Sequence, residues 1–269
     1  MIRLVSSDLN GTLVHQHTMM DMIRVGFPDE PERYKRAKEA FTQQTSGNLS
    51  MEAAFGIAGP LTKGLRLRTA IDYALTEMRF VDGFEDFIKK LHQNHILFVI
   101  NSTGYSITNE VIKVVYGPQF FHDVICNRLI FGYDSSRIVE EKEISELVAG
   151  YISGEKDSRI YDKISAVGTV KLGIRDENDK AQLIFEIADQ LGISRASIVH
   201  IGDTMGDSGG IYEVARHGGI GIAFNYNEAL KTYLEEKLKA GDVFGKIFMV
   251  SPKSTTSDIR NLLLLLFPG

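Results

Sequence analysis

The chain has 269 residues, 43 % of them apolar, so it can bury a substantial core as one large domain or as a core with a smaller companion. A net charge of −5, a pI near 5.8 and no basic tract argue against nucleic acid as a partner. The single cysteine, Cys126, excludes an intrachain disulfide and favours a cytoplasmic location. The sequence predicts neither a signal peptide nor a membrane span.

The first predicted strand is the apolar run at residues 2–5. The segment that follows, up to residue 80, contains no convincing strand but has helical stretches at 30–43, 50–57 and 67–77, separated by glycine- and proline-containing breaks. We therefore predict a small helical domain at residues 14–81, inserted between the two parts of a core formed by residues 1–13 and 82–269.

Beyond this insert, predicted helices and strands alternate. The predicted helices are 84–93, 108–115, 180–191, 213–217, 227–240 and 256–266. The predicted strands are 96–100, 197–201, 220–223 and 247–250, with a further strand or hairpin formed by 124–126 and 129–131. Residues 135–171 have no predicted element. This alternation is typical of an α/β, doubly wound, Rossmann-like parallel sheet.

Polar residues occur at four places that such a sheet brings to one edge. They are Asp8-Leu9-Asn10-Gly11-Thr12 after the first strand, Asn101-Ser102-Thr103-Gly104-Tyr105 after a later one, Lys180 at a helix start, and Gly202-Asp203-Thr204-Met205-Gly206-Asp207. An aspartate can attack phosphorus or hold a metal ion, and two carboxylates four residues apart suit magnesium. Hydroxyl and backbone donors, with a lysine, suit a phosphate.

Each of these features has a structural alternative. Ser102 could satisfy backbone groups, Lys180 could be an exposed residue, and Asp203 and Asp207 could cap the following helix. Their joint occurrence, in this order and each after an apolar strand, favours a single site.

The order of these motifs resembles that of the haloacid dehalogenase superfamily, and most closely its phosphoserine phosphatase-like members. The resemblance covers nearly the whole chain, because similar strings occur at Val81-Asp82-Gly83-Phe84, Asn127-Arg128-Leu129 and Ile222-Ala223-Phe224-Asn225. It implies a core with a helical cap, here residues 14–81, and a magnesium-dependent phosphatase that forms an aspartyl phosphate.

The resemblance also implies a role for each motif residue. Asp8 would be the nucleophile, and Ser102 and Lys180 would assist catalysis by holding the phosphoryl group. The phosphate-binding set would be Asp8, Gly11, Ser102, Thr103, Gly104 and Lys180. The Mg²⁺ set would be Asp8, Asn10 through its backbone carbonyl, Asp203 and Asp207.

Asn10 departs from the pattern, because the family has an aspartate there that protonates the leaving group and activates water. An amide does not titrate near pH 7, and loss of general acid–base help costs about 10²–10⁴-fold in rate. Three interpretations follow: a phosphatase that is slow or uses His15 or His17, a phosphotransferase or non-catalytic phosphate-binding protein, or a substitution introduced to trap a complex. We favour a phosphomonoester hydrolase acting on a small phosphorylated metabolite.

Two further departures concern the substrate. His17 and Ala58 occupy the places where phosphoserine phosphatases have a glutamate and an arginine that hold the serine group, so phosphoserine is not the favoured substrate. Lys63, Arg66 and Arg68 are nearby cap cations that could equally be surface residues. The sequence predicts neither the physiological substrate nor the oligomeric state.

Overall fold

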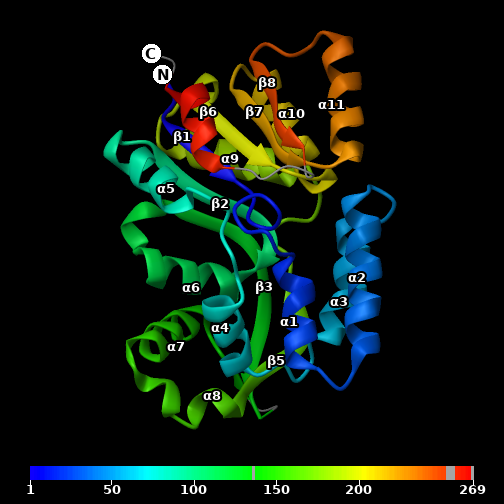
Figure 1. Cartoon of the computed structure of the whole chain (residues 1–269), viewed down its shortest axis with the longest axis vertical. Helices are drawn as coiled ribbons and strands as arrows, with labels where there is room; N and C mark the ends of the chain where they lie inside the picture. The colour runs from blue at the N-terminus through cyan, green and yellow to red at the C-terminus, as the bar shows by residue number, and fades with distance from the viewer. Residues whose placement is uncertain (135–136, 253–257, 268–269) are drawn as a thin grey trace.

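A computed structural model describes residues 1–134, 137–252 and 258–267. Its centre is a sheet in the order β4-β3-β2-β1-β6-β7-β8, with β5 paired to β3 off this path (Figure 1). The pairs from β3 to β8 are parallel, whereas β4 and β5 run antiparallel to β3. The strands are β1 Leu4–Ser7, β2 Leu97–Tyr105, β3 Asp123–Tyr133, β4 Arg137–Ile138, β5 Ile164–Lys171, β6 Ile198–Gly202, β7 Ile220–Tyr226 and β8 Lys246–Pro252.

Helices cover both faces of the parallel sheet. In β1, Leu4 packs in a cluster with Ile184 of α9, while Val5 packs in another with Phe87 of α5. Successive side chains of a strand point to opposite faces, so this confirms the predicted doubly wound arrangement. The helices of this half are α5 Phe84–Gln93, α6 Ser106–Tyr116, α9 Asp179–Gln190, α10 Ser208–Arg216, α11 Glu228–Ala240 and α12 Leu263–Leu266, with short 3₁₀ turns at Pro118–Phe120, Arg195–Ser197, η4 Met205–Asp207 and Ile259–Leu262.

The remaining helices lie below the sheet in Figure 1, where the lower half of β3 extends among them. Phe41 and Ile71 belong to the same apolar cluster as Phe131 of β3, Tyr161 and Ile164, so the insert and residues 129–174 share one core. The division into 1–13 with 82–269 and 14–81 stays a prediction. The helices here are α1 Thr18–Gly26, α2 Pro31–Thr45, α3 Met51–Leu61, α4 Leu67–Thr76, α7 Glu141–Ser153 and α8 Ile160–Lys163, with a 3₁₀ turn at Glu155–Asp157.

The structure differs from the sequence prediction in several elements. Of the strand or hairpin predicted at 124–126 and 129–131, the strand is confirmed: both runs belong to β3, whose first half pairs with β2 and whose second half pairs with β5. Residues 135–171, which had no predicted element, include α7, α8 and β5 within their described part, and α1 was not predicted. The start of the predicted helix 256–266 lies outside the described residues. Among the residues described, no helix is both long and apolar enough to cross a bilayer.

Candidate active site

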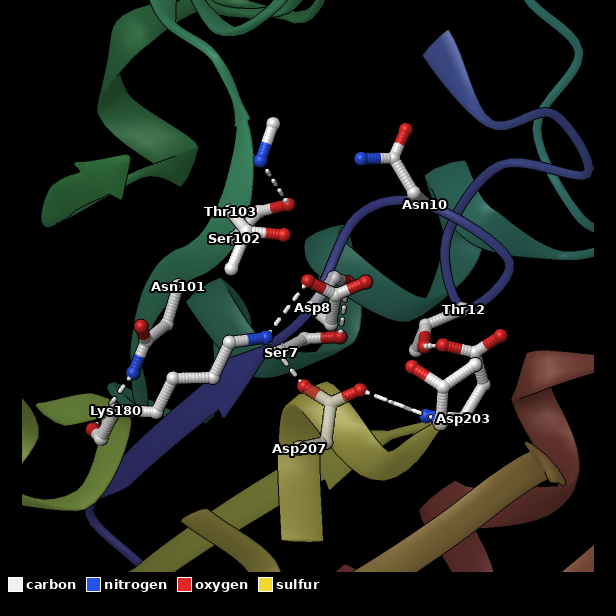
Figure 2. Close-up of polar contacts among 12 residues, drawn as sticks. Ser7, Asp8, Asn10, Thr12, Asn101, Ser102, Thr103, Lys180, Asp203 and Asp207 are labelled. Atoms are coloured by element: carbon white, nitrogen blue, oxygen red, sulfur yellow. Dashed lines mark hydrogen bonds and ion pairs between the residues drawn. The ribbon is translucent and has the colours of Figure 1, made fainter. Parts of the chain in front are cut away.

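The residues predicted to form one site do come together (Figure 2). Asp8 follows β1, which lies between β2 and β6 in the sheet. Ser102 comes from β2, Lys180 from α9, and Asp203 and Asp207 from the segment after β6. These elements meet at the carboxyl ends of the central strands, where the strand order reverses and where doubly wound sheets bind ligands.

A buried lysine links two of the carboxylates. Lys180 Nζ donates to Asp8 Oδ1 at 2.9 Å and to Asp207 Oδ1, and the lysine side chain is only 1 % exposed. Burial disfavours its ammonium form, but Asp207 and Asp8 outweigh this and hold the pKa of Lys180 above its ordinary value. The structure therefore makes Lys180 a buried ion-pair centre, and not the exposed residue of the alternative interpretation.

The two carboxylates that contact this lysine have different pKa values. Burial raises the pKa of Asp8 to about 6, against the opposing effect of Lys180 and with a smaller contribution from the charge of Asp207. Burial would also raise the pKa of Asp207, but Lys180 and the nearby His200 lower it to about 2. Both carboxyl groups are thus ionised near pH 7, and Asp8 can act as a nucleophile.

The segment after β6 turns tightly around Asp207. Asp207 Oδ2 accepts hydrogen bonds from the backbone N–H of Asp203 at 3.1 Å and of Thr204 at 3.4 Å, so this residue also caps the 3₁₀ turn η4. Asp203 Oδ1 accepts from the Thr12 hydroxyl at 3.4 Å. Gly11, with φ at +80°, passes so close that a Cβ there would lie 2.1 Å from Asp203 Oδ2.

These carboxylates suit a metal ion. Asp8, Asp203 and Asp207 each offer an oxygen within 4.8 Å of the others, and all three are buried. Among the described residues, the ammonium of Lys180 pairs with two members of this group, Asp8 and Asp207. A donor set made only of carboxylate oxygens fits a hard divalent cation.

The second motif forms part of β2, which continues through Tyr105 instead of ending before Ser102. Its pairing with β3 shifts register between Ser102 and Tyr105. Ser102 Oγ accepts from the Gly104 N–H at 3.1 Å, and a hydrogen bond from Ser102 favours the ionised form of Asp8. Asn127 fixes the strand from the other side by donating to the Thr103 carbonyl at 3.0 Å.

Asn10 connects the first motif to the insert. Its Oδ1 accepts from the backbone N–H of Thr18 at 2.9 Å and from the Thr18 hydroxyl at 2.7 Å. Its Nδ2 is buried without a hydrogen-bond partner, and it would lie 3.0 Å from a Cβ placed on Gly104. The amide nitrogen therefore faces the second motif, as Figure 2 shows.

A cavity of about 250 Å³ lies between these motifs and the insert. The core contributes Asp8, Asn10, Gly11, Thr103, Lys180, Asp203, Thr204, Gly206, Asp207 and Asn227, and the insert contributes His15, Gln16, His17, Met20, Phe41, Thr42, Gln44 and Thr45. Asn227 Nδ2 donates to the Thr45 carbonyl at 3.4 Å, which joins the end of α2 to the core. A larger hollow of about 760 Å³ elsewhere contains none of the predicted site residues.

Several predicted insert residues lie away from the cavity. Ala58 is buried in the core of the insert, and Lys63, Arg66 and Arg68 do not line the cavity. Arg68 instead contacts both carboxylate oxygens of Asp162, at 2.7 and 3.1 Å. The interpretation of these cations as surface residues therefore fits the structure better than a role in this cavity.

Sequence reasoning missed Gln44 and His200. Gln44 lies on the buried face of α2 with Ala37 and Phe41, and a polar residue at an apolar position is a signal that could have identified it. His200 is fully buried, with Nδ1 3.0 Å from Ser6 Oγ and Nε2 3.6 Å from Asp207 Oδ1. Its Nε2 has no hydrogen-bond partner among the described residues, and burial lowers the pKa of this histidine.

No protein-family model matches the chain. Two curated proteins are similar. One is the 2-hydroxy-3-keto-5-methylthiopentenyl-1-phosphate phosphatase of Lysinibacillus sphaericus, 25 % identical over 55 % of this chain and 61 % of that protein. The other is the phosphoserine phosphatase of Archaeoglobus fulgidus, 22 % identical over 90 % of this chain and 58 % of that protein. The matches thus span about three fifths of these relatives.

Solved structures extend the likeness to the whole chain. A phosphoserine phosphatase with an analogue of the phospho-aspartyl intermediate has a TM-score of 0.69 at 20 % identity, with 99 % of both chains covered. At this identity the likeness concerns the fold. The chain therefore has the fold of the haloacid dehalogenase-like hydrolases, and its sequence resembles the phosphatases among them, phosphoserine phosphatase included.

Proposed function

We propose that the chain is a phosphomonoester hydrolase of the haloacid dehalogenase type, acting on a small phosphorylated metabolite. The observation that carries this proposal is the buried Asp8, bonded to Lys180 at 2.9 Å and lining the cavity beside two further carboxylates. A phosphate needs a nucleophile, cationic partners and backbone donors in one place, and this site supplies all three.

The reaction would proceed in two steps. An oxygen of Asp8 attacks phosphorus, the bond from phosphorus to the ester oxygen breaks, and the departing alkoxide takes up a proton from solvent to leave as the alcohol. Water then attacks the resulting aspartyl phosphate and gives up a proton to solvent, which restores the Asp8 carboxylate and releases inorganic phosphate. Lys180 and the Ser102–Gly104 segment would hold the phosphoryl oxygens, and the insert would exclude bulk water from the cavity.

We infer that Mg²⁺ is the cofactor. Asp8, Asp203 and the backbone carbonyl of Asn10 would hold it, with Asp207 supporting the set from its position beside Lys180. When bound, the ion would neutralise charge on the phosphoryl group. The close approach of Gly11 to Asp203 supports this assignment, because the loop is shaped around that carboxylate.

The expected rate of ester hydrolysis depends on Asn10. Its side chain has no proton to transfer at neutral pH, so hydrolysis should be slow relative to an enzyme with an aspartate there. His15 and His17 line the cavity and are candidates for a substitute proton carrier. A phosphate-binding protein or phosphotransferase that no longer hydrolyses esters is the alternative, and Asn10 favours it over a fast phosphatase.

The names of the relatives indicate only a general class of substrate. Both act on phosphorylated small molecules, which supports a small metabolite here. His17 at the cavity and Ala58 inside the insert leave no arginine or glutamate at the two positions compared with phosphoserine phosphatases, so we do not propose phosphoserine. We propose a cytoplasmic location, which rests on the single cysteine.

The test is hydrolysis of p-nitrophenyl phosphate with and without Mg²⁺. We expect turnover that needs the ion and that Asp8→Asn abolishes, while Asp29→Asn, at an exposed position, leaves it unchanged. Magnesium affinity, measured by calorimetry, should fall at least about 100-fold in Asp203→Ala with the circular dichroism spectrum retained. Binding of phosphate and Mg²⁺ without any turnover would favour the binding protein.

A further inference from the structure

The charged groups of the cavity all lie at its core end. Asp8, Lys180, Asp203 and Asp207 are the only Lys, Arg, Asp or Glu side chains among its lining residues, within the part of the chain that the structure describes. All four are at most 5 % exposed and belong to the metal and phosphoryl end. The opposite end, which would face the alcohol part of a bound ester, contains none.

The insert end of the cavity is instead lined by neutral polar and apolar side chains. Phe41 and Met20 supply an aromatic and a thioether surface, and the ring of His17 packs 5.0 Å from that of Phe41. Thr42, Thr45 and Gln16 add uncharged hydrogen-bonding groups. A charged substituent here would lose its hydration without gaining an ionic partner.

Gln44, where the insert meets the core loop of Gly206, gives the cavity one specific recognition group. It is 4 % exposed, its amide nitrogen Nε2 has no hydrogen-bond partner, and that nitrogen would lie 3.4 Å from a Cβ placed on Gly206 at the cavity wall. An amide can present a donor or an acceptor, so it suits a hydroxyl or carbonyl group of a ligand. A buried polar group without a partner favours the ligand that satisfies it.

We propose that this cavity selects phosphomonoesters whose alcohol part is short and uncharged, with a hydroxyl or carbonyl placed to meet Gln44 and carbon atoms placed against Phe41 and Met20. This inference rests on the proposed function for the orientation of the phosphate. Because the described lining residues offer no ionic partner at the insert end, we expect amino-acid and carboxylic-acid phosphates to be poor substrates.

The first experiment measures binding of four propyl-chain phosphonates, which cannot be hydrolysed, at pH 8 with Mg²⁺. They are propylphosphonate, 3-hydroxypropylphosphonate, 3-aminopropylphosphonate and 3-phosphonopropionate. We expect the hydroxyl compound to bind best, and the amine and carboxylate at least about 100-fold more weakly. Equal binding of the charged and uncharged compounds would overturn the proposal.

The second experiment adds one negative charge to the cavity at Gln44. Gln44→Glu should raise affinity for the amine relative to the hydroxyl compound at least about tenfold, because it supplies the missing ionic partner. Gln43→Glu adds the same charge one residue away at an exposed position, and should leave the ratio unchanged. A ratio that moves equally in both variants would show that Gln44 does not face the ligand. The wild-type series decides the proposal by itself if Gln44→Glu does not fold.

Hydrolysis of the corresponding esters separates this inference from the proposed function. 2-Hydroxyethyl phosphate should have a kcat/KM at least about 100-fold above those of phosphoethanolamine and phosphoglycolate. Comparable turnover of all three would overturn the selectivity and leave the hydrolase intact. Selective phosphonate binding with no turnover of any ester would remove the hydrolase and leave the selectivity.

Discussion

The side-chain oxygen of Asn10 caps the first turn of α1 through the N–H of Thr18 at 2.9 Å, although the two residues are eight positions apart. His17, which immediately precedes this helix, makes no side-chain cap hydrogen bond. The motif loop thus supplies the cap that α1 lacks, and it does so with one side-chain atom of Asn10 while the other faces the active site. Asn10 therefore links the loop of the first motif to the placement of the insert.

Lys180 offers a test of how the site balances its charge. Lys180→Met in metal-free protein should lower the free energy of unfolding by about 3–5 kcal/mol at pH 7, because it leaves Asp8 and Asp207 as buried, unpaired carboxylates. Without the lysine their folded-state pKa values rise, so protons stabilise the variant as the pH falls, and its deficit should shrink toward pH 4. Urea unfolding at both pH values measures this.

The matched control is Lys89→Met, which removes an exposed lysine paired with Glu85 on α5. Both side chains of that pair are exposed, so we expect its loss to change the free energy of unfolding by no more than about 0.5 kcal/mol and by the same amount at both pH values. Equal losses in the two variants would show that the charge at Lys180 is not buried as described.

Substitution of Gly11 tests whether the loop after β1 must pass close to Asp203 for a metal ion to bind. Gly11→Ala combines an unfavourable φ of +80° with a Cβ 2.1 Å from Asp203 Oδ2, so we expect Mg²⁺ affinity to fall at least about tenfold as the carboxylate is displaced. Gly47→Ala has nearly the same φ, +78°, but its nearest neighbour is 3.9 Å away, so it should cost about 1–2 kcal/mol of stability and leave the affinity unchanged. Calorimetry on both variants would contradict this account if the affinities matched.

Local sequence patterns predicted the parallel sheet and the helices α2, α3 and α4 of the insert, but they missed α1 and β5. The doubly wound sheet followed from alternating apolar runs. The convergence of the site followed from placing Asp8 and Asp203 after strands and Lys180 at a helix start, whereas Ser102 lies within β2 and not after it. The helix α1 was not predicted because the residue that caps it, Asn10, lies eight positions before its first residue and not directly next to it. Likewise, the lower half of β3 is explained only by β5, which pairs with it from more than thirty residues along the chain.

The shared core leads to a prediction about folding. An isolated fragment of residues 14–81 should lack a cooperative thermal transition, because its buried side chains pack against Leu129, Phe131 and Ile164, which the fragment does not contain. Circular dichroism in the near and far ultraviolet measures this. A fragment that melts cooperatively with ordered aromatic signals would make residues 14–81 an independent domain.

Asn10→Asp tests the role of the asparagine directly. The variant keeps an oxygen for both Thr18 hydrogen bonds and replaces Nδ2, beside Gly104 and Ser102, with a second oxygen that can carry a proton. We expect hydrolysis of phosphate esters to rise by one or more powers of ten, within the roughly 10²–10⁴ typical of general acid–base catalysis. The gain should be larger for alkyl esters than for p-nitrophenyl phosphate, because a poor leaving group depends more on protonation.

Two controls separate proton transfer from structure. Asn10→Ala removes the cap of α1 without adding an acid, so it should lose about 1 kcal/mol of stability and gain no activity. Asp8→Asn added to Asn10→Asp should abolish turnover, because the second residue assists a nucleophile and cannot replace it. If Asn10→Asp binds Mg²⁺ and phosphate as the parent does but hydrolyses no ester faster, the loss of an acid–base group is not what limits the rate. The phosphate-binding alternative would then be the better account of the chain.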